Sequence, residues 1–185
     1  MNNFFLEKYT KSYFKVINNS QNLKKILVIA NILNKMNKKK KIIILGNGGS
    51  SAIASHFTVD LIKNTNLKCI NFSDHSLITC FANDYGYENW IEKCIEFYGE
   101  KDDVLIAISS SGKSKNILNG VKSAKKKIFS KIITLSGFDK KNPLKKTGDL
   151  NIWVDSKVYN IVENAHQYFL LTCIDLINYK RINLK

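Results

Sequence analysis

The chain has 185 residues, 44% of them hydrophobic, and a formal net charge of +14. This length fits one domain with its own core, and this apolar content excludes a disordered chain. No apolar run reaches the roughly 18–20 residues that a membrane-spanning helix needs, so we expect no membrane association. The N-terminal residues lack the pattern of a signal peptide, which predicts a cytoplasmic protein.

The first predicted elements are helical. Apolar residues recur near a period of 3.6 over residues 3–37, with a polar break at 18–21 where Asn19 or Ser20 could cap the second helix. Further helices are expected at 51–64, 76–83, 89–98, 114–127 and 159–179. Strands are expected at 42–45, 68–72, 103–108, 131–135 and 150–154.

This alternation defines the expected fold class. Short apolar strands that alternate with helices favour a parallel sheet with helices on both faces. The sequence therefore predicts an α/β three-layer sandwich with a five-stranded parallel sheet and an N-terminal helical extension. The helix at 159–179 is apolar on more than one face, which indicates burial against another subunit.

The positive charge raises the question of a nucleic-acid ligand. The lysines cluster at the ends of predicted elements, and aromatic residues are not interleaved with them. That pattern argues against nucleic acid as the primary ligand, although a diffuse positive field would attract an anionic substrate.

The four cysteines show no paired spacing, which predicts free, buried thiols. They are Cys69, Cys80, Cys94 and Cys173.

Two glycine- and serine-rich loops each follow a predicted strand and precede a predicted helix. The first is Gly46-Asn-Gly-Gly-Ser-Ser51, and the second is Ser109-Ser-Ser-Gly-Lys-Ser114. Backbone N–H groups and hydroxyls in such loops can converge on an anion at a helix N-terminus. Two of them predict a site for a phosphorylated small molecule.

Neither loop fits a nucleotide motif. Ser51 holds the last glycine position of G-x-G-x-x-G, and no acidic residue ends the next strand to bind a ribose. The second loop has Ala107 where a Walker A motif opens with glycine. We therefore expect no nucleotide cofactor.

Several segments in chain order together resemble the sugar isomerase (SIS) family, most closely its phosphoheptose isomerase branch, which acts on sedoheptulose 7-phosphate. The segments are Gly46-Asn-Gly-Gly-Ser50, Ala54-Ser-His-Phe57, Ala82-Asn-Asp-Tyr-Gly86, residues 99–116 and Thr134-Leu-Ser-Gly137. The resemblance covers nearly the whole chain. It implies a single SIS domain over residues 1–185, a helical part at 1–40 used in oligomerisation, and a homotetramer with intersubunit sites.

The resemblance also implies substrate-binding residues. Ser109, Ser110, Ser111 and Ser114 would hold the sugar phosphate. Asn47, Gly48 and Ser50 would line the sugar end, and Asp84 would contact substrate hydroxyls. Four serines within six positions exceed what a helix cap needs, which favours phosphate binding over capping alone.

The catalytic positions depart from the family pattern. The family places His and Glu one helical turn apart, and this chain has His56 and Asp60 there, still on one helix face. On the terminal helix, Glu163 and Leu171 stand where the family has Gln and His. His166 matches a histidine that the family often has earlier on this helix. The catalytic candidates are therefore Asp60, His56, Glu163 and His166.

These substitutions leave the cofactor and the reaction open. His56, Asp60 and Glu163 could bind zinc, or could form a polar pocket without metal, which the substitutions favour slightly. The preferred function is aldose–ketose isomerisation of sedoheptulose 7-phosphate for heptose precursors of lipopolysaccharide or capsule. A non-catalytic SIS protein that associates with a replication initiator is the alternative. A third is an isomerase for another sugar phosphate, with the base relocated to Asp60, Glu163 or His166.

Overall fold

A computed structural model describes residues 3–182 and shows one parallel sheet in the order β2-β1-β3-β4-β5. All four strand pairs are parallel. The strands are β1 (Lys41–Leu45), β2 (Lys68–Asn71), β3 (Val104–Ser109), β4 (Lys131–Ser136) and β5 (Leu150–Trp153).

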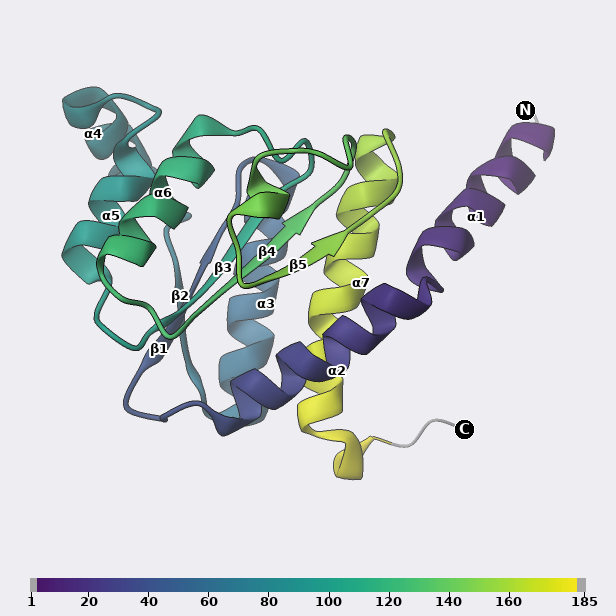
Figure 1. Ribbon diagram of the computed structural model, residues 1–185, viewed down its shortest axis with the longest axis horizontal. Coiled ribbons are helices and arrows are strands. Elements are labelled where there is room, and N and C mark those ends of the chain that lie inside the picture. The colour runs from purple at the N-terminus through teal and green to yellow at the C-terminus, as the bar shows by residue number, and fades with distance from the viewer. Residues whose placement is uncertain (1–2, 183–185) are drawn as a thin grey trace.

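Seven α-helices within the described residues form the two outer layers (Figure 1). One face is covered by α1, α2, α3 and α7, and the other by α4, α5 and α6. Their bounds are α1 (Asn3–Ile17), α2 (Ser20–Lys35), α3 (Gly49–Thr65), α4 (His75–Tyr85), α5 (Trp90–Tyr98), α6 (Lys115–Lys126) and α7 (Tyr159–Ile177). The predicted three-layer α/β fold is confirmed.

The central strands are buried on both faces, which explains why they read as continuous apolar runs. Ile42 and Ile44 of β1 pack into the cluster under α3 and α7, whereas Ile43 packs into the cluster under α5 and α6. All six residues of β3 are buried. The core therefore consists of two apolar layers, one on each side of the sheet.

Element boundaries match the predictions closely, with two informative differences. Asn19 caps α2 by accepting a hydrogen bond from Asn22 N–H at 3.0 Å, as expected. Helix α3 begins at Gly49 instead of residue 51, because the glycines themselves form its first turn. A short 3₁₀ helix, η1 (Leu144–Lys146), lies in a segment that the sequence indicates as loop.

Helix α7 was expected to be buried against another subunit, but this chain covers much of it. Its apolar residues, such as Phe169 and Leu170, are buried within the same chain, where α7 contacts α2 and α3. Helix α1, in contrast, projects from the body of the molecule (Figure 1), and Val16 is its one buried residue. Apolar side chains of α1, among them Phe4 and Phe14, are exposed.

All four cysteines are free, and three of them are buried as predicted. Burial raises the pKa of the Cys69, Cys94 and Cys173 thiols to about 12. Cys80 is exposed on α4, which the sequence did not predict.

The strand order positions the site. β1 and β3 are neighbours in the sheet, but β1 continues into α3 on one face and β3 continues into α6 on the other. The two loops therefore diverge at the carboxyl ends of adjacent strands and leave a crevice, where ligands bind in open α/β sheets. None of the helices described in residues 3–182 has the length and apolarity that a bilayer span requires.

Candidate active site

Residues 109–114, from the last residue of β3 to the residue before α6, form a turn that curls back on itself, and we call them the serine loop. Gly112 has a φ of +66° and its N–H donates to the Ser109 carbonyl at 2.9 Å. This turn brings the Ser109 and Ser114 hydroxyl oxygens to 3.0 Å from each other. Hydroxyls and helix N–H groups thus converge on one point, which suits an anion.

A cavity of about 130 Å³ lies at this point, and we call it the serine cavity. It is lined by Asn47, Ser50, Ile108, Ser109, Ser110, Ser111, Ser114, Tyr159 and Glu163. This volume equals that of roughly four waters, given about 30 Å³ for each in the liquid. The cavity therefore fits a phosphate group, and the rest of a sugar phosphate must extend outside it.

The four serines are not equivalent. Ser109, Ser111 and Ser114 present hydroxyls that form hydrogen bonds within the loop. The Ser110 hydroxyl oxygen is buried and has no hydrogen-bond partner among the described residues. Ser110 nevertheless lines the serine cavity, so it differs from the other three serines only in that its hydroxyl forms no hydrogen bond within the loop.

The glycine-rich loop after β1 is linked to α6, the helix that follows the serine loop, by two side-chain amides. Asn47 and Asn116 each donate to the other's side-chain oxygen at 2.9 Å. Gly48 has a φ of +52°, in the region that favours glycine, and caps α3. Asn116 therefore fixes the width of the crevice. The sequence did not indicate Asn116 as a functional residue, although its position two residues after Ser114 could have done so.

A second missed residue supports the serine loop from behind. Asn142 is buried, and a Cβ on Gly112 would overlap its side chain. The Asn142 amide donates to the Gly137 carbonyl at 3.2 Å and the Asp139 carbonyl at 2.7 Å. The loop after β4 thus holds Asn142 rigidly against Gly112. No sequence pattern indicated this contact.

Glu163 is the catalytic candidate that lines the serine cavity. Its carboxylate lies so close to Gly49 that a Cβ at that position would overlap it. Gly49 is the first residue of α3, so the carboxylate lies at the positive end of the helix dipole. The glycine is therefore needed for the approach of an acidic group from α7.

His56 and Asp60 form a second group on α3. His56 Nε2 lies 3.2 Å from Asp60 Oδ2, and the Gln167 amide of α7 lies 3.4 Å from His56 Nδ1. The two side chains are 47% and 37% exposed. The imidazole thus lies between Asp60 and Gln167 where α3 packs against α7, and we call this contact region the α3–α7 seam.

Leu171 lies one turn after Gln167 on α7, as Asp60 lies one turn after His56 on α3. Because both helices follow parallel strands on the same face, this spacing puts Leu171 level with Asp60. Leu171 is partly buried against the apolar cluster. The position that the family fills with histidine is therefore an apolar part of the seam in this chain.

His166 does not face the seam. It is fully buried, and its Nε2 lies 3.2 Å from the Ser136 carbonyl of β4. Burial lowers the pKa of His166 to about 4, against a smaller opposing effect of the hydrogen bond. A neutral imidazole enclosed against the sheet has no path to a substrate in the serine cavity.

Asp84 is also separate from the cavity within this chain. It is exposed on α4, where it accepts a hydrogen bond from the Asn83 amide at 3.0 Å. Helix α4 has no buried residue and covers the opposite face of the sheet from α3.

The predicted metal ligands do not meet in one chain. The Glu163 carboxylate lies beside Gly49, the first residue of α3. Along α3, His56 is seven residues and about 10 Å from Gly49, and Asp60 is eleven residues and about 16 Å from it. Within residues 3–182, no three His, Cys, Asp or Glu side chains are grouped closely enough to bind a metal ion. The residues of a single chain therefore do not fit a zinc site.

Comparisons with known proteins agree with this geometry. The model of the SIS domain family matches residues 5–137. A phosphoheptose isomerase of Histophilus somni is 40% identical over 131 residues, which covers 68% of this chain and 67% of that protein. One from Helicobacter pylori strain P12 is 35% identical over 153 residues, covering 78% and 79%. A solved structure of a phosphoheptose isomerase from Francisella tularensis superimposes with a TM-score of 0.84 at 27% identity and covers 96% of each chain.

Proposed function

The chain belongs to the SIS domain family, and from this premise we propose that it is a sugar-phosphate isomerase of the phosphoheptose type. Its substrate would be sedoheptulose 7-phosphate or a related ketose phosphate. The observation that carries the proposal is the serine cavity, which combines a phosphate-sized space with Glu163 at its edge. The names of the similar proteins favour the isomerase over a non-catalytic SIS protein.

The phosphate would bind in the serine cavity. Hydroxyls of Ser109, Ser111 and Ser114 would donate to its oxygens, and the N-terminus of α6 would add a favourable dipole. Asn47 and Ser50 line the side toward α3, where the carbons nearest the phosphate, C7 and C6, would lie. Ser110 and Gly48 would contribute through the backbone that shapes the two loops.

The sugar would then extend along the α3–α7 seam toward His56 and Asp60. Isomerisation moves a proton between C1 and C2 through an enediol, so it needs a base near these carbons and an acid near their oxygens. Asp60 would act as the base, and His56, held by Gln167, would exchange a proton with the oxygens. Glu163 would bind sugar hydroxyls near the phosphate. We give His166 no chemical role, because it is enclosed in the core.

Assembly would complete the site. We propose a homotetramer in which the exposed apolar side chains of α1 are covered by other copies and residues 1–40 serve in oligomerisation. Asp84 on the exposed helix α4 would then reach a neighbouring copy's substrate. Any zinc site would need ligands from two copies, so no step of the proposed chemistry depends on metal.

The product would be an aldoheptose 7-phosphate for lipopolysaccharide or capsule precursors, made in the cytoplasm by a single-domain protein. The test is incubation of the purified protein with sedoheptulose 7-phosphate, with and without added zinc, followed by measurement of the aldose by NMR. We expect conversion that is lost in the Ser109→Ala/Ser114→Ala variant. Intact sugar-phosphate binding without conversion would overturn the proposal and favour the non-catalytic alternative.

A further inference from the structure

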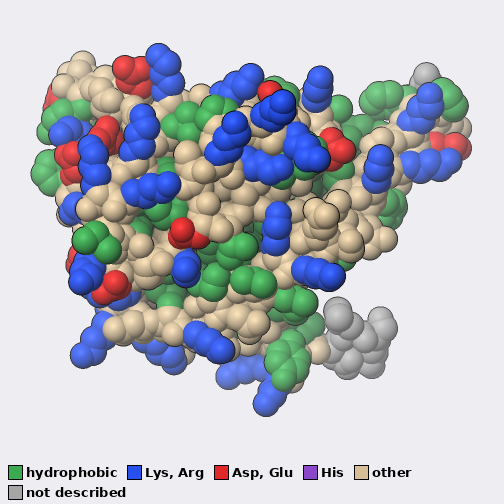
Figure 2. All heavy atoms as spheres, in the orientation of Figure 1, with side chains coloured by type: hydrophobic (Ala, Val, Ile, Leu, Met, Phe, Trp, Pro, Cys, Tyr) green, Lys and Arg blue, Asp and Glu red, His purple; other side chains and the backbone are tan. Residues whose placement is uncertain are grey.

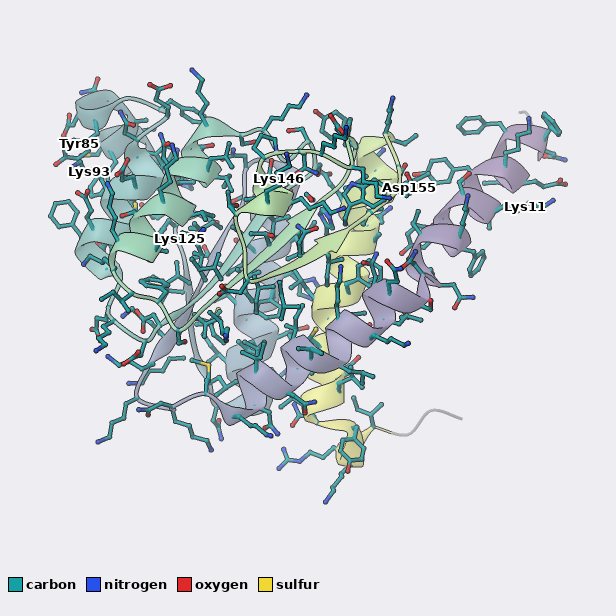
Figure 3. The ribbon with its side chains drawn as sticks, in the orientation of Figure 1. Lys11, Tyr85, Lys93, Lys125, Lys146 and Asp155 are labelled. Carbon is teal, nitrogen blue, oxygen red and sulfur yellow. The ribbon has the colours of Figure 1, made fainter. Side chains whose placement is uncertain are left out.

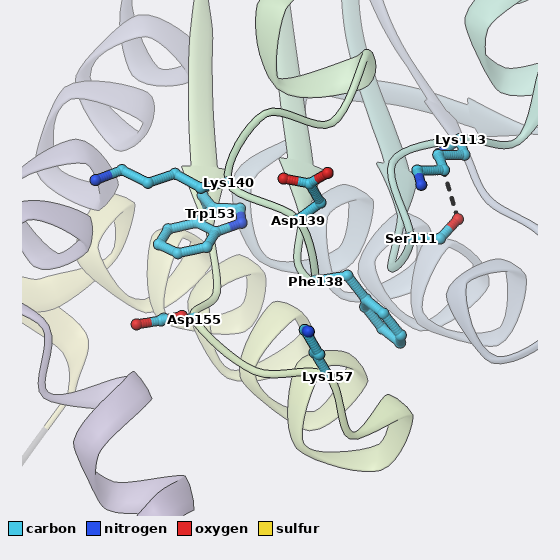
Figure 4. Close-up of a pocket in the computed structure, with 8 residues that line it drawn as sticks. All are labelled: Ser111, Lys113, Phe138, Asp139, Lys140, Trp153, Asp155 and Lys157. Carbon is cyan, nitrogen blue, oxygen red and sulfur yellow. Dashed lines mark hydrogen bonds between the residues drawn. The ribbon is translucent and has the colours of Figure 1, made fainter.

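A second and larger cavity lies on the other side of the serine loop, over the carboxyl ends of β4 and β5. Its volume is about 650 Å³, within the range of sites for small molecules. It is lined by Ser111, Lys113, Phe138, Asp139, Lys140, Trp153, Asp155 and Lys157 (Figure 4). We call it the lysine-lined cavity.

The lining side chains come from four separate segments that the fold brings together. These are the serine loop, the loop after β4, the end of β5 and the turn before α7 (Figure 4). The Lys157 ammonium points into the space between Phe138 and Trp153, whereas Lys140 extends past Trp153, away from Lys113 and Lys157 (Figure 4). Lys146 on η1 and Asp155 after β5 lie at this same end of the sheet (Figure 3).

Three lysines and two aspartates line the cavity, so its lining carries a net charge of +1, and the lysines form no ion pair with the carboxylates. Among the ion pairs of residues 3–182, none involves Lys113, Lys140 or Lys157. Figure 2 shows Lys and Arg side chains gathered over this part of the molecule. Burial lowers the pKa of Lys145, and the charge of Lys140 lowers it further, as expected where two cations lie close together.

The remaining residues suit a sugar. The Trp153 ring is partly exposed and lies 4.6 Å from the Lys145 ammonium, and its N–H donates to the Gly137 carbonyl at 3.2 Å. Its position is therefore fixed from two sides. An aromatic surface can pack against the C–H groups of a sugar, and the carboxylates of Asp139 and Asp155 can accept hydrogen bonds from hydroxyls.

The wall between the two cavities is thin. Ser111 lines both of them. Phe138 of the lysine-lined cavity and Tyr159 of the serine cavity have ring centroids 4.7 Å apart. Phe138 also has a φ of +54°, which is unusual for a bulky residue and is held by the loop that contains Asn142.

We propose that the lysine-lined cavity is a second binding site for a phosphorylated sugar, next to the serine cavity and separate from it. Lysine ammonium groups bind the phosphate, the two carboxylates bind hydroxyls, and Trp153 packs against the carbon skeleton. This site goes beyond the proposed isomerase function, because it does not include Glu163, His56 or Asp60.

The chain contains its own reporter for this site. Of its two tryptophans, Trp153 lines the cavity, whereas Trp90 is buried in the apolar cluster on the opposite face. Sorbitol 6-phosphate is a suitable probe because it has the phosphate and hydroxyls but no carbonyl to isomerise. We expect a saturable change in Trp153 fluorescence in the full-length Trp90→Phe protein, with sodium chloride at equal ionic strength giving none.

Three double variants assign the signal to one of the two cavities. Lys140→Gln/Lys157→Gln should weaken the affinity measured in the fluorescence titration at least about 10²-fold, because two charge-assisted contacts to the phosphate are lost. Lys38→Gln/Lys39→Gln removes the same charge just before β1, at the amino ends of the strands, and should leave the response unchanged. Ser109→Ala/Ser114→Ala should also keep it, because neither serine lines this cavity.

Calorimetry provides a second measurement that does not depend on the Trp90→Phe variant. The wild-type protein should bind two molecules of sorbitol 6-phosphate per chain, and each cavity variant should bind one. A single site in the wild type, or a fluorescence response that disappears with the serine variant and survives the lysine variant, would overturn the second site. The proposed isomerase function fails separately, through absence of turnover.

Discussion

The two ends of the proposed active site differ in how completely one chain builds them. At the serine cavity, Ser109 and Asn116 are buried, and the loop is held by Gly112 and Asn142. At the α3–α7 seam, His56 and Asp60 lie in the open. If the site functions as proposed, the fold of a single chain preorganises its phosphate end, whereas its proton-transfer end needs further enclosure.

The same contrast describes where the chain departs from its family. The serine loop retains four hydroxyls in six positions, but the seam carries Asp60 and Leu171 where the family pattern has Glu and His. Substitutions at the phosphate end would disturb backbone geometry on which several elements depend. At the exposed seam, a change of side chain alters chemistry with little effect on folding.

The largest expected effect is at the phosphate end. Ser109→Ala/Ser114→Ala removes two donors to a charged group, each worth roughly 1.5–3 kcal/mol, so affinity for sedoheptulose 7-phosphate should fall about 10²–10⁴-fold. Calorimetry measures this directly. Ser130→Ala, just before β4 at the amino ends of the strands, is the matched control and should bind sedoheptulose 7-phosphate normally. Equal affinity in both variants would show that the phosphate does not bind at the serine loop.

The next prediction distinguishes the roles of the two carboxylates of the proposed site, Asp60 and Glu163. Asp60→Asn keeps the size of the side chain and its hydrogen bonding but removes the base, so kcat should fall at least about 10²-fold with little change in KM. Glu163→Gln keeps a hydrogen-bonding group beside Gly49 and should mainly raise KM. Steady-state kinetics distinguish them, and the reverse pattern would make Glu163 the base.

The support behind the serine loop can be tested with a glycine pair. Gly112→Ala forces a Cβ at φ +66° into Asn142, whereas Gly86→Ala has a φ of +83° but open space around it. Both incur backbone strain, but overlap adds about 1–3 kcal/mol at Gly112 alone. Urea unfolding should show the larger loss at Gly112. Equal losses would mean that Asn142 yields easily and does not hold the loop.

The smallest expected effect concerns His166 and leaves the active site untouched. Its folded pKa of about 4 lies below the ordinary 6.5, so the unfolded chain binds a proton first as pH falls. Its contribution therefore lowers stability by roughly 2 kcal/mol between pH 7 and pH 5. His166→Gln should reduce this pH dependence in urea unfolding. If stability depended on pH in the same way in the variant, the proton taken up on unfolding would bind to a group other than His166.

Much of this architecture could be predicted from the sequence because it depends on local patterns. The apolar pattern predicted every strand and α-helix that the structure describes, and the two glycine-rich loops marked the crevice between β1 and β3. The side chains that share a cavity were harder, because they come from distant segments. Trp153 and Lys140 meet only through the packing of β4 against β5.

Helix α7 shows the limit of periodicity most clearly. Because it is apolar on most of its surface, the sequence could not tell which residue faces the core. His166 was a catalytic candidate, but it points to β4, whereas Glu163 and Gln167 face α3. His166 and Gln167 are adjacent in sequence, and the rotation of about 100° between them separates a buried structural histidine from a residue of the candidate site.

The most direct test of the central claim is incubation with sedoheptulose 7-phosphate in D₂O, followed by NMR. If the serine cavity holds the phosphate and Asp60 moves a proton through an enediol, the aldose product should carry deuterium at C2. Asp60→Asn should bind the sugar phosphate with unchanged affinity but show neither product nor exchange. Tight binding by the wild type with no product and no exchange would contradict the account.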